Sequence, residues 1–471
     1  MKDKIMANNK HQIMEEIIPK GGHVHLIGIG GVGMSGLALL LKEKGYTVSG
    51  SDLKESYYLA KVRQAGVKVK IGHCRDNASG ADLVCYSSAV KDDNPELVFA
   101  RDQGIALIGR GSLLAALSRD KKVIAVSGSH GKTTTSALLT FLLSSCGYEP
   151  AAFIGAQPCN YEQAAWWGND FFVIEADESD GSFLSYSPWV AIVTNIDKEH
   201  MDFYKTEQKL TEMFSCFFSS AQELAIAWGD LPQMRSLLRD RPFLTYGFEP
   251  HNQVRAGNVR VCGKYTLFDL RAGETLYRDI KIMLPGEHNV LNACAALSFF
   301  YHIKEDLNKV ISFLAEFKST KRRFQRKGSC RGIDFVDDYA HHPTEIKATL
   351  KAAAALNPER IVALFQPHRF SRVSALQQEF SLSFADADLL VLTDVYAASE
   401  VRPDDFDEEK FRKEIKNKFS GQFEYIPKHR LAAEVPLLLH EGDLVIGLGA
   451  GDINTVLDEI FREYQKSGIK A

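Results

Sequence analysis

The chain has 471 residues, of which 45% are hydrophobic, so it is too long for one ordinary core and has enough apolar residues for two or three. Its formal net charge of −4 excludes a strongly basic nucleic-acid surface and a polybasic membrane anchor. We therefore expect a multidomain protein that binds no nucleic acid and in which any cationic ligand site is local.

The N-terminal stretch MKDKIMANNKHQIMEEIIPK mixes charges and amides and lacks the continuous apolar core of a signal peptide. No later apolar run is long enough to span a bilayer. The eight cysteines are scattered, without a C-x-x-C pair or zinc-site spacing, as is typical of reduced thiols. These features predict a cytoplasmic protein without membrane insertion.

The first segment, HVHLIGIGGVGMSGLALLLKEKGYTVSGSD, is typical of a strand, a glycine turn, a helix and a second strand. Gly28, Gly30 and Gly33 form G-x-G-x-x-G, and Asp52 ends the second strand, where a ribose-binding carboxylate is expected. The motif taken literally predicts a dinucleotide. Another nucleotide, including a UDP-sugar, and plain helix–sheet packing remain alternatives. The runs VKVKIG, DLVCYSSAV and IALIG continue the parallel sheet to about residue 118.

A second glycine turn, GSHGKTTT, lies between the apolar run VIAVS and the helical stretch SALLTFLLSS. Backbone N–H groups and the positive end of the helix would face phosphate oxygens, Lys132 would add a charge, and the Thr133 hydroxyl would ligate Mg²⁺. The spacing departs from the usual GxxxxGK[ST], because Val126 stands where the first glycine is required. The turn predicts a phosphate cradle, with a plain strand-to-helix turn as the alternative.

Two later strands in this segment end in polar groups. FFVIEADESD places Glu175 at the end of one apolar run, and VAIVTNIDKEHMD places Asn195 and His200 after the next. Ligands of a doubly wound sheet bind at the carboxyl ends of its strands, so we expect Glu175 to share a site with Lys132 and Thr133 and to hold Mg²⁺ or its water shell. A solvated acid at Glu175 and a packed or capping His200 are the alternatives.

The run LPGEHNVLNACAALSFF predicts a loop and then a helix beginning near Asn289. Polar groups gather at its start: His288, Asn289 and Asn292. They suit either capping of the helix or hydrogen bonds to the edge of a base.

From about Phe324 a third α/β unit follows, with the strand-like runs GIDFVDDY, IVALFQP, LLVLTDVY and LVIGLGAG. The chemically crowded loops DDYAHHP and QPHRFSR follow the first two of these strands. Arg369 and Arg372 stand three apart at a helix start, a spacing that fits bidentate capture of a carboxylate. Ordinary surface arginines are the alternative.

Nine motifs occur in order between about residues 22 and 455: GIGGVGMSG, GSD, GSHGKTTT, EADESDGSFL, VTNIDKEHMD, PGEHNVLNA, KRRF, DDYAHHP and QPHRFSR. This set resembles the cytoplasmic Mur ligases of peptidoglycan synthesis. The resemblance implies an α/β fold of three domains: a Rossmann-like N-terminal domain for a UDP-sugar (residues 1–118), a central P-loop-type ATPase domain (119–322) and a Rossmann-like C-terminal domain for an amino acid (323–471).

The resemblance implies an ATP-dependent ligase that uses ATP and Mg²⁺ and joins UDP-N-acetylmuramate to L-alanine. The lactyl carboxylate would first attack the γ-phosphate, and the resulting acyl phosphate would then be attacked by the amine. Because both steps move charge between oxygens, positioning and cations matter more than a side-chain nucleophile. The ATP site and the amino-acid pocket fall on different domains, which predicts closure before chemistry.

The resemblance also assigns roles to individual residues. The UDP-sugar loop would consist of Gly30, Gly31, Val32 and Gly33, with Asp52 nearby. The ATP cradle would consist of Gly128, Ser129, His130, Gly131, Lys132, Thr133 and Thr134, with His288, Asn289 and Asn292 on the adenine side and Asp338 at the nucleotide edge. Thr133 and Glu175 would hold one Mg²⁺, and His200 a second.

The remaining implied roles concern the reacting groups. Lys132, Glu175, His200, Arg323 and His341 would be catalytic, with Arg323 reaching the phosphates. The alanine pocket would consist of Tyr339, His341, Arg369 and Arg372, with His341 as a candidate acceptor of the amine proton.

Three rivals remain from the sequence. A sister ligase would join a ready-made tripeptide to UDP-N-acetylmuramate during cell-wall recycling, although GGVGMSG and NIDKEHMD argue against it. An NAD-dependent oxidoreductase would use G-x-G-x-x-G and Asp52 but leave GSHGKTTT, Glu175 and QPHRFSR without a role. A nucleotide-gated switch would need neither a UDP-sugar loop nor an amino acid.

Overall fold

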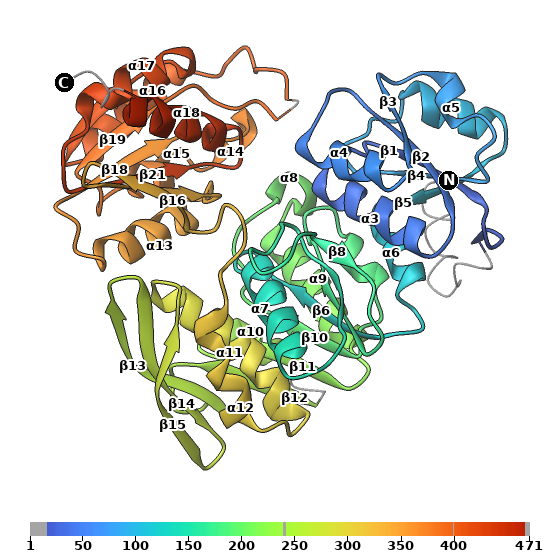
Figure 1. Ribbon diagram of the computed structural model, residues 1–471, viewed down its shortest axis with the longest axis horizontal. Coiled ribbons are helices and arrows are strands. Elements are labelled where there is room, and N and C mark those ends of the chain that lie inside the picture. The colour runs from blue at the N-terminus through green and yellow to red at the C-terminus, as the bar shows by residue number, and fades with distance from the viewer. Residues whose placement is uncertain (1–16, 239–241, 399, 467–471) are drawn as a thin grey trace. The chain divides into compact units, whose positions relative to one another are not determined.

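The computed structural model describes residues 17–238, 242–398 and 400–466 (Figure 1). The chain forms two compact units. The first runs through residue 257 and includes 270–277 and 291–314, and the second contains 258–269, 278–290 and the chain from 315 onward. Three sheets, of five, ten and six strands, organise the α/β fold, which confirms the predicted fold class.

The first sheet is wholly parallel, as predicted, with the order β3-β2-β1-β4-β5. Its strands are β1 (His23–Ile27), β2 (Thr47–Asp52), β3 (Lys68–Ile71), β4 (Leu83–Tyr86) and β5 (Ala106–Gly109). Its helices are α3 (Val32–Glu43), α4 (Tyr57–Gln64), α5 (Pro95–Asp102) and α6 (Arg110–Leu117). Because β1 pairs with β2 on one side and β4 on the other, the strand order reverses at β1, and such a reversal is where ligands of open α/β sheets bind.

The second sheet has the order β15-β14-β13-β12-β11-β10-β6-β9-β7-β8. Its strands are β6 (Lys122–Ser127), β7 (Ala151–Phe153), β8 (Ala165–Trp166), β9 (Phe171–Glu175), β10 (Val190–Val193), β11 (Leu224–Trp228), β12 (Phe243–Gly247), β13 (Val254–Cys262), β14 (Tyr265–Ala272) and β15 (Thr275–Ile282). The helices associated with it are α7 (Lys132–Ser145), α8 (Met201–Tyr204), α9 (Glu207–Ser220), α10 (Pro232–Leu237), α11 (Glu287–His302) and α12 (Leu307–Ser312).

The strands predicted from the apolar runs are confirmed in this sheet, since β6 pairs in parallel with both β9 and β10. Two details differ from the sequence-based expectation. Helix α11 begins at Glu287, two residues before the predicted start near Asn289. A sequence pattern does not locate a helix end to better than one or two residues. The strands β7, β8 and β11 to β15 were not predicted. In β13 and β15, charged residues interrupt the apolar alternation.

The third sheet has the order β16-β17-β21-β18-β19-β20, and only β16 is antiparallel to its neighbour among the pairs described. Its strands are β16 (Gln325–Cys330), β17 (Ile333–Asp338), β18 (Arg360–Phe365), β19 (Leu389–Leu392), β20 (Gln422–Tyr425) and β21 (Asp443–Leu448). Its helices are α13 (Pro343–Ala354), α14 (Phe370–Ala375), α15 (Gln377–Ser381), α16 (Glu408–Lys418), α17 (Leu431–Glu434) and α18 (Ile453–Lys466). The four predicted strands are confirmed as β17, β18, β19 and β21.

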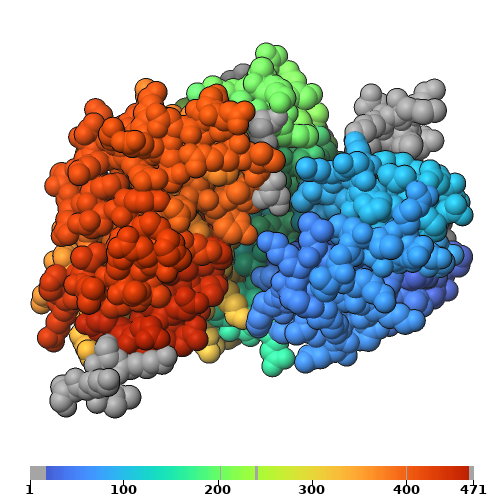
Figure 2. All heavy atoms as spheres, turned by 90° about the horizontal axis from the view of Figure 1, so that it is seen from above, coloured from blue at the N-terminus to red at the C-terminus, as the bar shows by residue number. Residues whose placement is uncertain are grey.

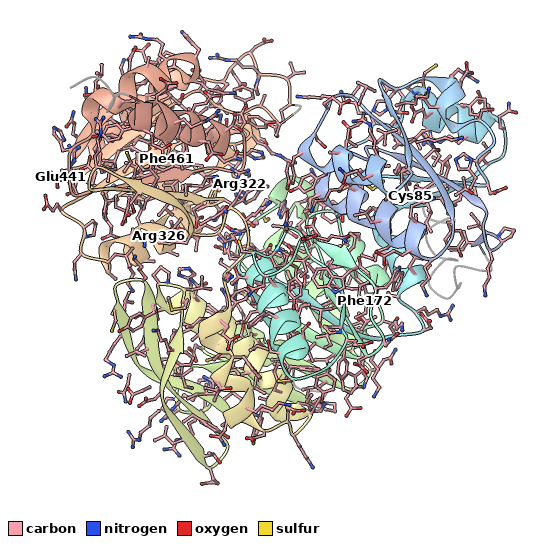
Figure 3. The ribbon with its side chains drawn as sticks, viewed as in Figure 1. Cys85, Phe172, Arg322, Arg326, Glu441 and Phe461 are labelled. Carbon is pink, nitrogen blue, oxygen red and sulfur yellow. The ribbon has the colours of Figure 1, made fainter. Side chains whose placement is uncertain are left out.

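The central parallel strands are almost wholly buried, as strands covered on both faces require: β6, β10, β18, β19 and β21. Cys85 on β4 and Phe172 on β9, both labelled in Figure 3, are fully buried in the first unit. In the space-filling view of Figure 2, the part of the chain that forms the first sheet appears in blue and the part that forms the third sheet in orange to red. No helix among the described residues combines the length and the apolarity needed to cross a bilayer. The N-terminal stretch used to predict a cytoplasmic protein lies mostly outside the described residues.

A buried carboxylate ties the strands of the first sheet together beneath the glycine turn. Glu96 on α5 is fully buried and accepts hydrogen bonds from His25 on β1, Ser51 on β2 and Asn77. Burial alone raises the pKa of Glu96, but these hydrogen bonds outweigh it and lower that pKa to about 2. Since the carbonyl of Ser51 accepts hydrogen bonds from the N–H groups of Gly28 and Ile29, this network sets the position of the glycine turn.

The Glu96→Gln variant should show a pH-dependent loss of stability. The pKa of Glu96 lies below its ordinary value of 4.5, so the ionised carboxylate stabilises the fold above that pH, and the benefit disappears as the pH falls toward 2. Thermal melts of the variant and the wild type should therefore differ most near pH 7 and converge below about pH 3. Glu43→Gln, at an exposed position on α3, is the control. A gap in melting temperature that stays constant down to pH 3 would contradict this role.

Candidate functional site

The first glycine turn is held by the strand beside it. The N–H of Gly30 donates a hydrogen bond of 2.8 Å to Oδ2 of Asp52, at the end of β2. A Cβ on Gly30 would lie 2.8 Å from the same oxygen, so a larger residue there would displace the carboxylate. Asp52, predicted to lie near a ribose, therefore uses one carboxylate oxygen to fix the turn itself.

Gly33, the last glycine of the turn, lies against a side chain from α6. A Cβ on Gly33 would lie 2.6 Å from Nη1 of Arg110, the first residue of α6. The guanidinium of Arg110 thus packs directly on the turn, and it pairs with Asp177 at 3.4 Å. Sequence reasoning missed Arg110, and its only signal was its place directly after the strand-like run IALIG.

The second glycine turn connects β6 to α7 with two left-handed glycines, Gly128 (φ 126°) and Gly131 (φ 83°). Asn195, two residues after β10, binds this turn in both directions: its Oδ1 accepts from the N–H of His130 at 2.9 Å, and its Nδ2 donates to the carbonyl of His130 at 3.0 Å. Thr194 also donates to that carbonyl at 2.6 Å. The neighbouring strand end therefore fixes the shape of the turn at the N-terminus of α7.

Lys132 begins α7, and its side chain is only 13% exposed. Its Nζ donates to the carbonyls of Gly128 and Ser129 at 2.6 and 3.1 Å and pairs with Glu178 at 2.8 Å. Burial lowers the pKa of this amine, but the surrounding carboxylates outweigh it and raise the pKa. Burial raises the pKa of Glu178, and the adjacent Lys132 ammonium opposes that shift. Sequence reasoning noted the run of acids after Glu175 but did not single out Glu178.

Thr133 and Glu175 meet as predicted. The Thr133 hydroxyl donates to Oε1 of Glu175 at 2.9 Å, and the N–H of Gly155 donates to Oε2 at 2.6 Å. A Cβ on Gly155 would lie 2.5 Å from Oε1, so a side chain there would collide with the carboxylate. A hydroxyl and a carboxylate at a helix N-terminus are the oxygen ligands that Mg²⁺ prefers.

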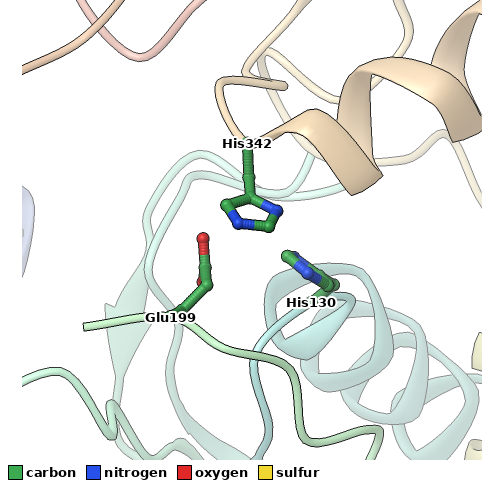
Figure 4. A group of neighbouring side chains, drawn as sticks. All are labelled: His130, Glu199 and His342. Atoms are coloured by element: carbon green, nitrogen blue, oxygen red, sulfur yellow. The ribbon is translucent and has the colours of Figure 1, made fainter. Parts of the chain in front are cut away.

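His200 stands beside two buried acids. Its Nε2 lies 3.8 Å from Oε1 of Glu178 and 3.9 Å from Oε2 of Glu199, and one ligand atom from each of the three lies within 4.8 Å of the others. Oε1 of Glu199 is buried and has no hydrogen-bond partner among the described residues, so this oxygen is a candidate ligand for a cation. Figure 4 shows Glu199 from the segment before α8 and His130 from the glycine turn.

The polar residues at the start of α11 have different local partners. Asn292 lies against the glycine turn, because its Oδ1 accepts from the Thr135 hydroxyl at 3.2 Å and would lie 2.5 Å from a Cβ on Gly131. Asn289 donates to the carbonyl of Pro285 at 2.8 Å, and its Nδ2 lies 3.1 Å from Nε2 of His288. Burial lowers the pKa of His288 to about 4, so its ring is neutral at pH 7 and one of its nitrogens can accept a hydrogen bond.

In the second unit, the KRRF and DDYAHHP segments hold each other. Asp338 accepts from the N–H groups of Phe324 and Ala340, both at 2.7 Å, and the N–H of Tyr339 donates to the carbonyl of Arg322 at 2.6 Å. Arg322 and Phe324 have left-handed φ values of 61° and 45°, which mark a tightly bent connection into β16. Arg323 lies 3.5 Å from Glu345.

Four rings contact one another in sequence around the residues that were predicted to bind the amino acid. The ring centroids of Tyr339 and His341 are 5.3 Å apart, those of His341 and His368 are 5.7 Å apart, and His368 stacks on Tyr396 at 5.5 Å. Arg372 donates to Nδ1 of His368 at 3.2 Å. Burial lowers the pKa of His341 well below its usual range, so its ring is neutral at pH 7. His368 and Tyr396 were not among the predicted site residues.

Arg369 precedes α14 with a left-handed φ of 68°, and its buried Nε has no hydrogen-bond partner among the described residues. A buried guanidinium nitrogen without an acceptor indicates a site for an anionic oxygen. The structure thus brings Lys132, Thr133, Glu175, His200 and Asn292 together in the first unit and the predicted amino-acid residues together in the second. The other residues predicted for the nucleotide or its phosphates, His288, Asn289, Arg323 and Asp338, belong to the second unit, and the individual roles stay predictions.

Three family models match consecutive parts of the chain. They describe the Mur ligase family catalytic domain (residues 23–122), the Mur ligase middle domain (126–300) and the Mur ligase glutamate ligase domain (322–451). A UDP-N-acetylmuramate--L-alanine ligase from Desulfotalea psychrophila is 43% identical over 446 residues, covering 93% of this chain and 97% of that protein. The chain belongs to the Mur ligase family.

Solved structures of Mur ligases share the fold. The UDP-N-acetylmuramate-alanine ligase MurC from Thermotoga maritima matches with a TM-score of 0.82 and 29% identity, covering 94% of this chain and 99% of that one. A murein peptide ligase from Psychrobacter arcticus matches with a TM-score of 0.70 and 23% identity over the same shares, and that level of identity shows the fold alone.

Replacing Asn195 with alanine should loosen the glycine turn. The substitution removes both hydrogen bonds to His130, and each is worth about 1 kcal/mol. We therefore expect the affinity for Mg-ATP, measured by calorimetry, to fall roughly tenfold or more. The exposed Asn308→Ala on α12 is the control and should bind as the wild type does. An unchanged affinity in Asn195→Ala would show that the turn keeps its shape without this side chain.

Proposed function

We propose that this Mur ligase is an ATP-dependent UDP-N-acetylmuramate:L-alanine ligase that acts in the cytoplasm in peptidoglycan precursor synthesis. Relatives of that name match nearly the whole chain, as with the 39% identical protein from Desulforamulus reducens, which spans 95% of this chain and 99% of that one. The observation that carries the proposal is the turn at the N-terminus of α7, where Lys132, Thr133 and Glu175 meet.

The proposed reaction begins with attack of the lactyl carboxylate on the γ-phosphate of ATP. The products of this step are ADP and an acyl phosphate, whose carbonyl carbon is then attacked by the amine of L-alanine, and collapse of the tetrahedral intermediate expels phosphate. Lys132 and the N–H groups at the start of α7 would stabilise charge on the phosphoryl oxygens. Arg323 would add a second cation to the phosphates.

Mg²⁺ would be held by Thr133 and Glu175, with His200 at a second ion, and it would neutralise charge on the transferred phosphoryl group. The donor set fits, because the Thr133–Glu175 pair offers oxygen ligands and Glu199 keeps a buried oxygen without a described partner. The chain's own contribution is to hold these oxygens at fixed positions through Gly155 and the glycine turn.

The substrates would be recognised at two further places. Gly30 to Gly33, held by Asp52, would receive the diphosphate of the UDP-sugar. Arg369 and Arg372 would bind the carboxylate of L-alanine, and His341, neutral at pH 7, would be placed to accept a proton from the amine. His288, Asn289, Asn292 and Asp338 would border the nucleotide.

The rival functions account for less of the chain. An NAD-dependent oxidoreductase leaves the Lys132 turn and the arginines of α14 without a role. The recycling ligase shares the fold, but the 43% identical relative is named an L-alanine ligase. A choice among alanine, serine and glycine rests on one methyl or hydroxyl group, worth only about 1–3 kcal/mol.

The direct test is phosphate release from Mg-ATP by the purified protein with UDP-N-acetylmuramate, in the presence and absence of L-alanine, L-serine, glycine or the tripeptide. Release that needs both the UDP-sugar and L-alanine supports the proposal. Release only with the tripeptide would favour the recycling ligase, and release indifferent to both substrates would favour a nucleotide switch.

In the same assay, Lys132→Ala removes the cation from the proposed phosphoryl-transfer site. Such a contact is worth roughly 3–4 kcal/mol, so turnover should fall about two to three decades. Lys209→Ala, at an exposed lysine on α9, is the matched control and should keep full activity. Near-normal turnover in Lys132→Ala would mean that the lysine does not contact the phosphates.

A further inference from the structure

The nearest neighbours of Gly30 and Gly31, in the glycine turn after β1, include an acid and no base. The atoms closest to a Cβ placed on either glycine belong to Asp52, Ser56 and Gly28, and the carboxylate of Asp52 is the only charged group among these described neighbours. A diphosphate carries two or more negative charges, and backbone N–H groups alone compensate them only in part. A cation beside this turn would add to the compensation that its backbone N–H groups give a diphosphate.

Arg110 supplies that cation. It is the first residue after β5, and β5 lies beyond β4 from the glycine turn, so α6 begins at the same carboxyl edge of the sheet. Its Nη1 would touch a Cβ on Gly33 at 2.6 Å, so the guanidinium packs on the last glycine of the turn. With 23% of its side chain exposed, it is held in place and still reachable by a ligand.

Asp177 fixes the orientation of Arg110. Its Oδ2 lies 3.4 Å from Nη2, so the pair occupies one side of the guanidinium, and the Nη1 side faces Gly33. This ion pair holds the arginine against the turn.

We infer that Arg110 is a diphosphate-binding residue for the UDP-sugar, acting from the N-terminus of α6 on the phosphates that the Gly30–Gly33 turn receives. The inference rests on the proposed function, because it takes the nucleoside diphosphate of that substrate as its ligand. UDP contains the same nucleoside diphosphate as UDP-N-acetylmuramate, so UDP alone is a sufficient probe.

The test compares binding of UDP-N-acetylmuramate, UDP and uridine to the full-length protein and its Arg110→Gln variant, by calorimetry or competition. Loss of a charge-assisted hydrogen bond to phosphate should weaken binding of UDP-N-acetylmuramate and UDP by about ten- to a hundredfold. Uridine, which has no phosphate, should bind both proteins equally. Arg110→Lys, which keeps the charge, should lose less affinity than Arg110→Gln.

Arg75→Gln is the matched control, since Arg75 belongs to the same part of the chain and makes an exposed ion pair with Asp102. Equal UDP affinity in Arg110→Gln and wild type would overturn the inference. An equal loss for uridine and UDP would also overturn it, because that pattern indicates a purely structural arginine. A wild-type protein that binds no UDP-sugar would instead refute the proposed function, so the two failures are distinguishable.

Discussion

The arrangement of the proposed ATP site depends on the buried ammonium of Lys132, which needs negatively charged or hydrogen-bonding partners. An amine on a side chain that is only 13% exposed must have anions in contact, or its burial would cost several kcal/mol. Glu178 at 2.8 Å meets this requirement, and two carbonyls of the glycine turn accept hydrogen bonds from the ammonium. The phosphate oxygens of a bound nucleotide are also negatively charged, so they would compete with the Glu178 carboxylate for this ammonium.

The same constraint extends to Arg110. The acids after β9 serve two cations, since Asp177 pairs with Arg110 and has its pKa lowered beside Lys132, while the next residue, Glu178, pairs with Lys132 itself. A short acidic segment thus connects the arginine beside the first glycine turn to the lysine of the second. Asp177 and Glu178 therefore pair with one cation at each of the two proposed phosphate-binding turns.

The two glycine turns share the same design: each precedes a helix and is held by a polar side chain. Each leaves N–H groups at a helix N-terminus available to an anion, and each is fixed by a polar side chain from the neighbouring strand. Asp52 binds the N–H of Gly30 in the first turn, and Asn195 binds the N–H and carbonyl of His130 in the second. Fixed turns of this kind place backbone dipoles before a ligand arrives, which is the preorganisation that phosphoryl transfer needs.

Sequence reasoning found the parallel strands and the phosphate turn because both have local signals. Apolar runs of four to eight residues predicted β1, β6 and β18, and the rule that ligands bind at the carboxyl ends of parallel strands placed Thr133 beside Glu175. It did not find β13 to β15, whose charged residues weaken the alternation, or the short half-buried β20. It also missed Arg110 and Glu178, because their partners lie far away in the sequence and no spacing rule connects them.

The acyl-phosphate route is the central claim, and oxygen transfer tests it most directly. UDP-N-acetylmuramate labelled with ¹⁸O in its lactyl carboxylate would be incubated with Mg-ATP, L-alanine and the protein, and the released phosphate analysed by mass spectrometry. Attack of the carboxylate on the γ-phosphate predicts one ¹⁸O atom in each phosphate formed from doubly labelled substrate. Phosphate without the label, released while the amide product accumulates, would contradict the account.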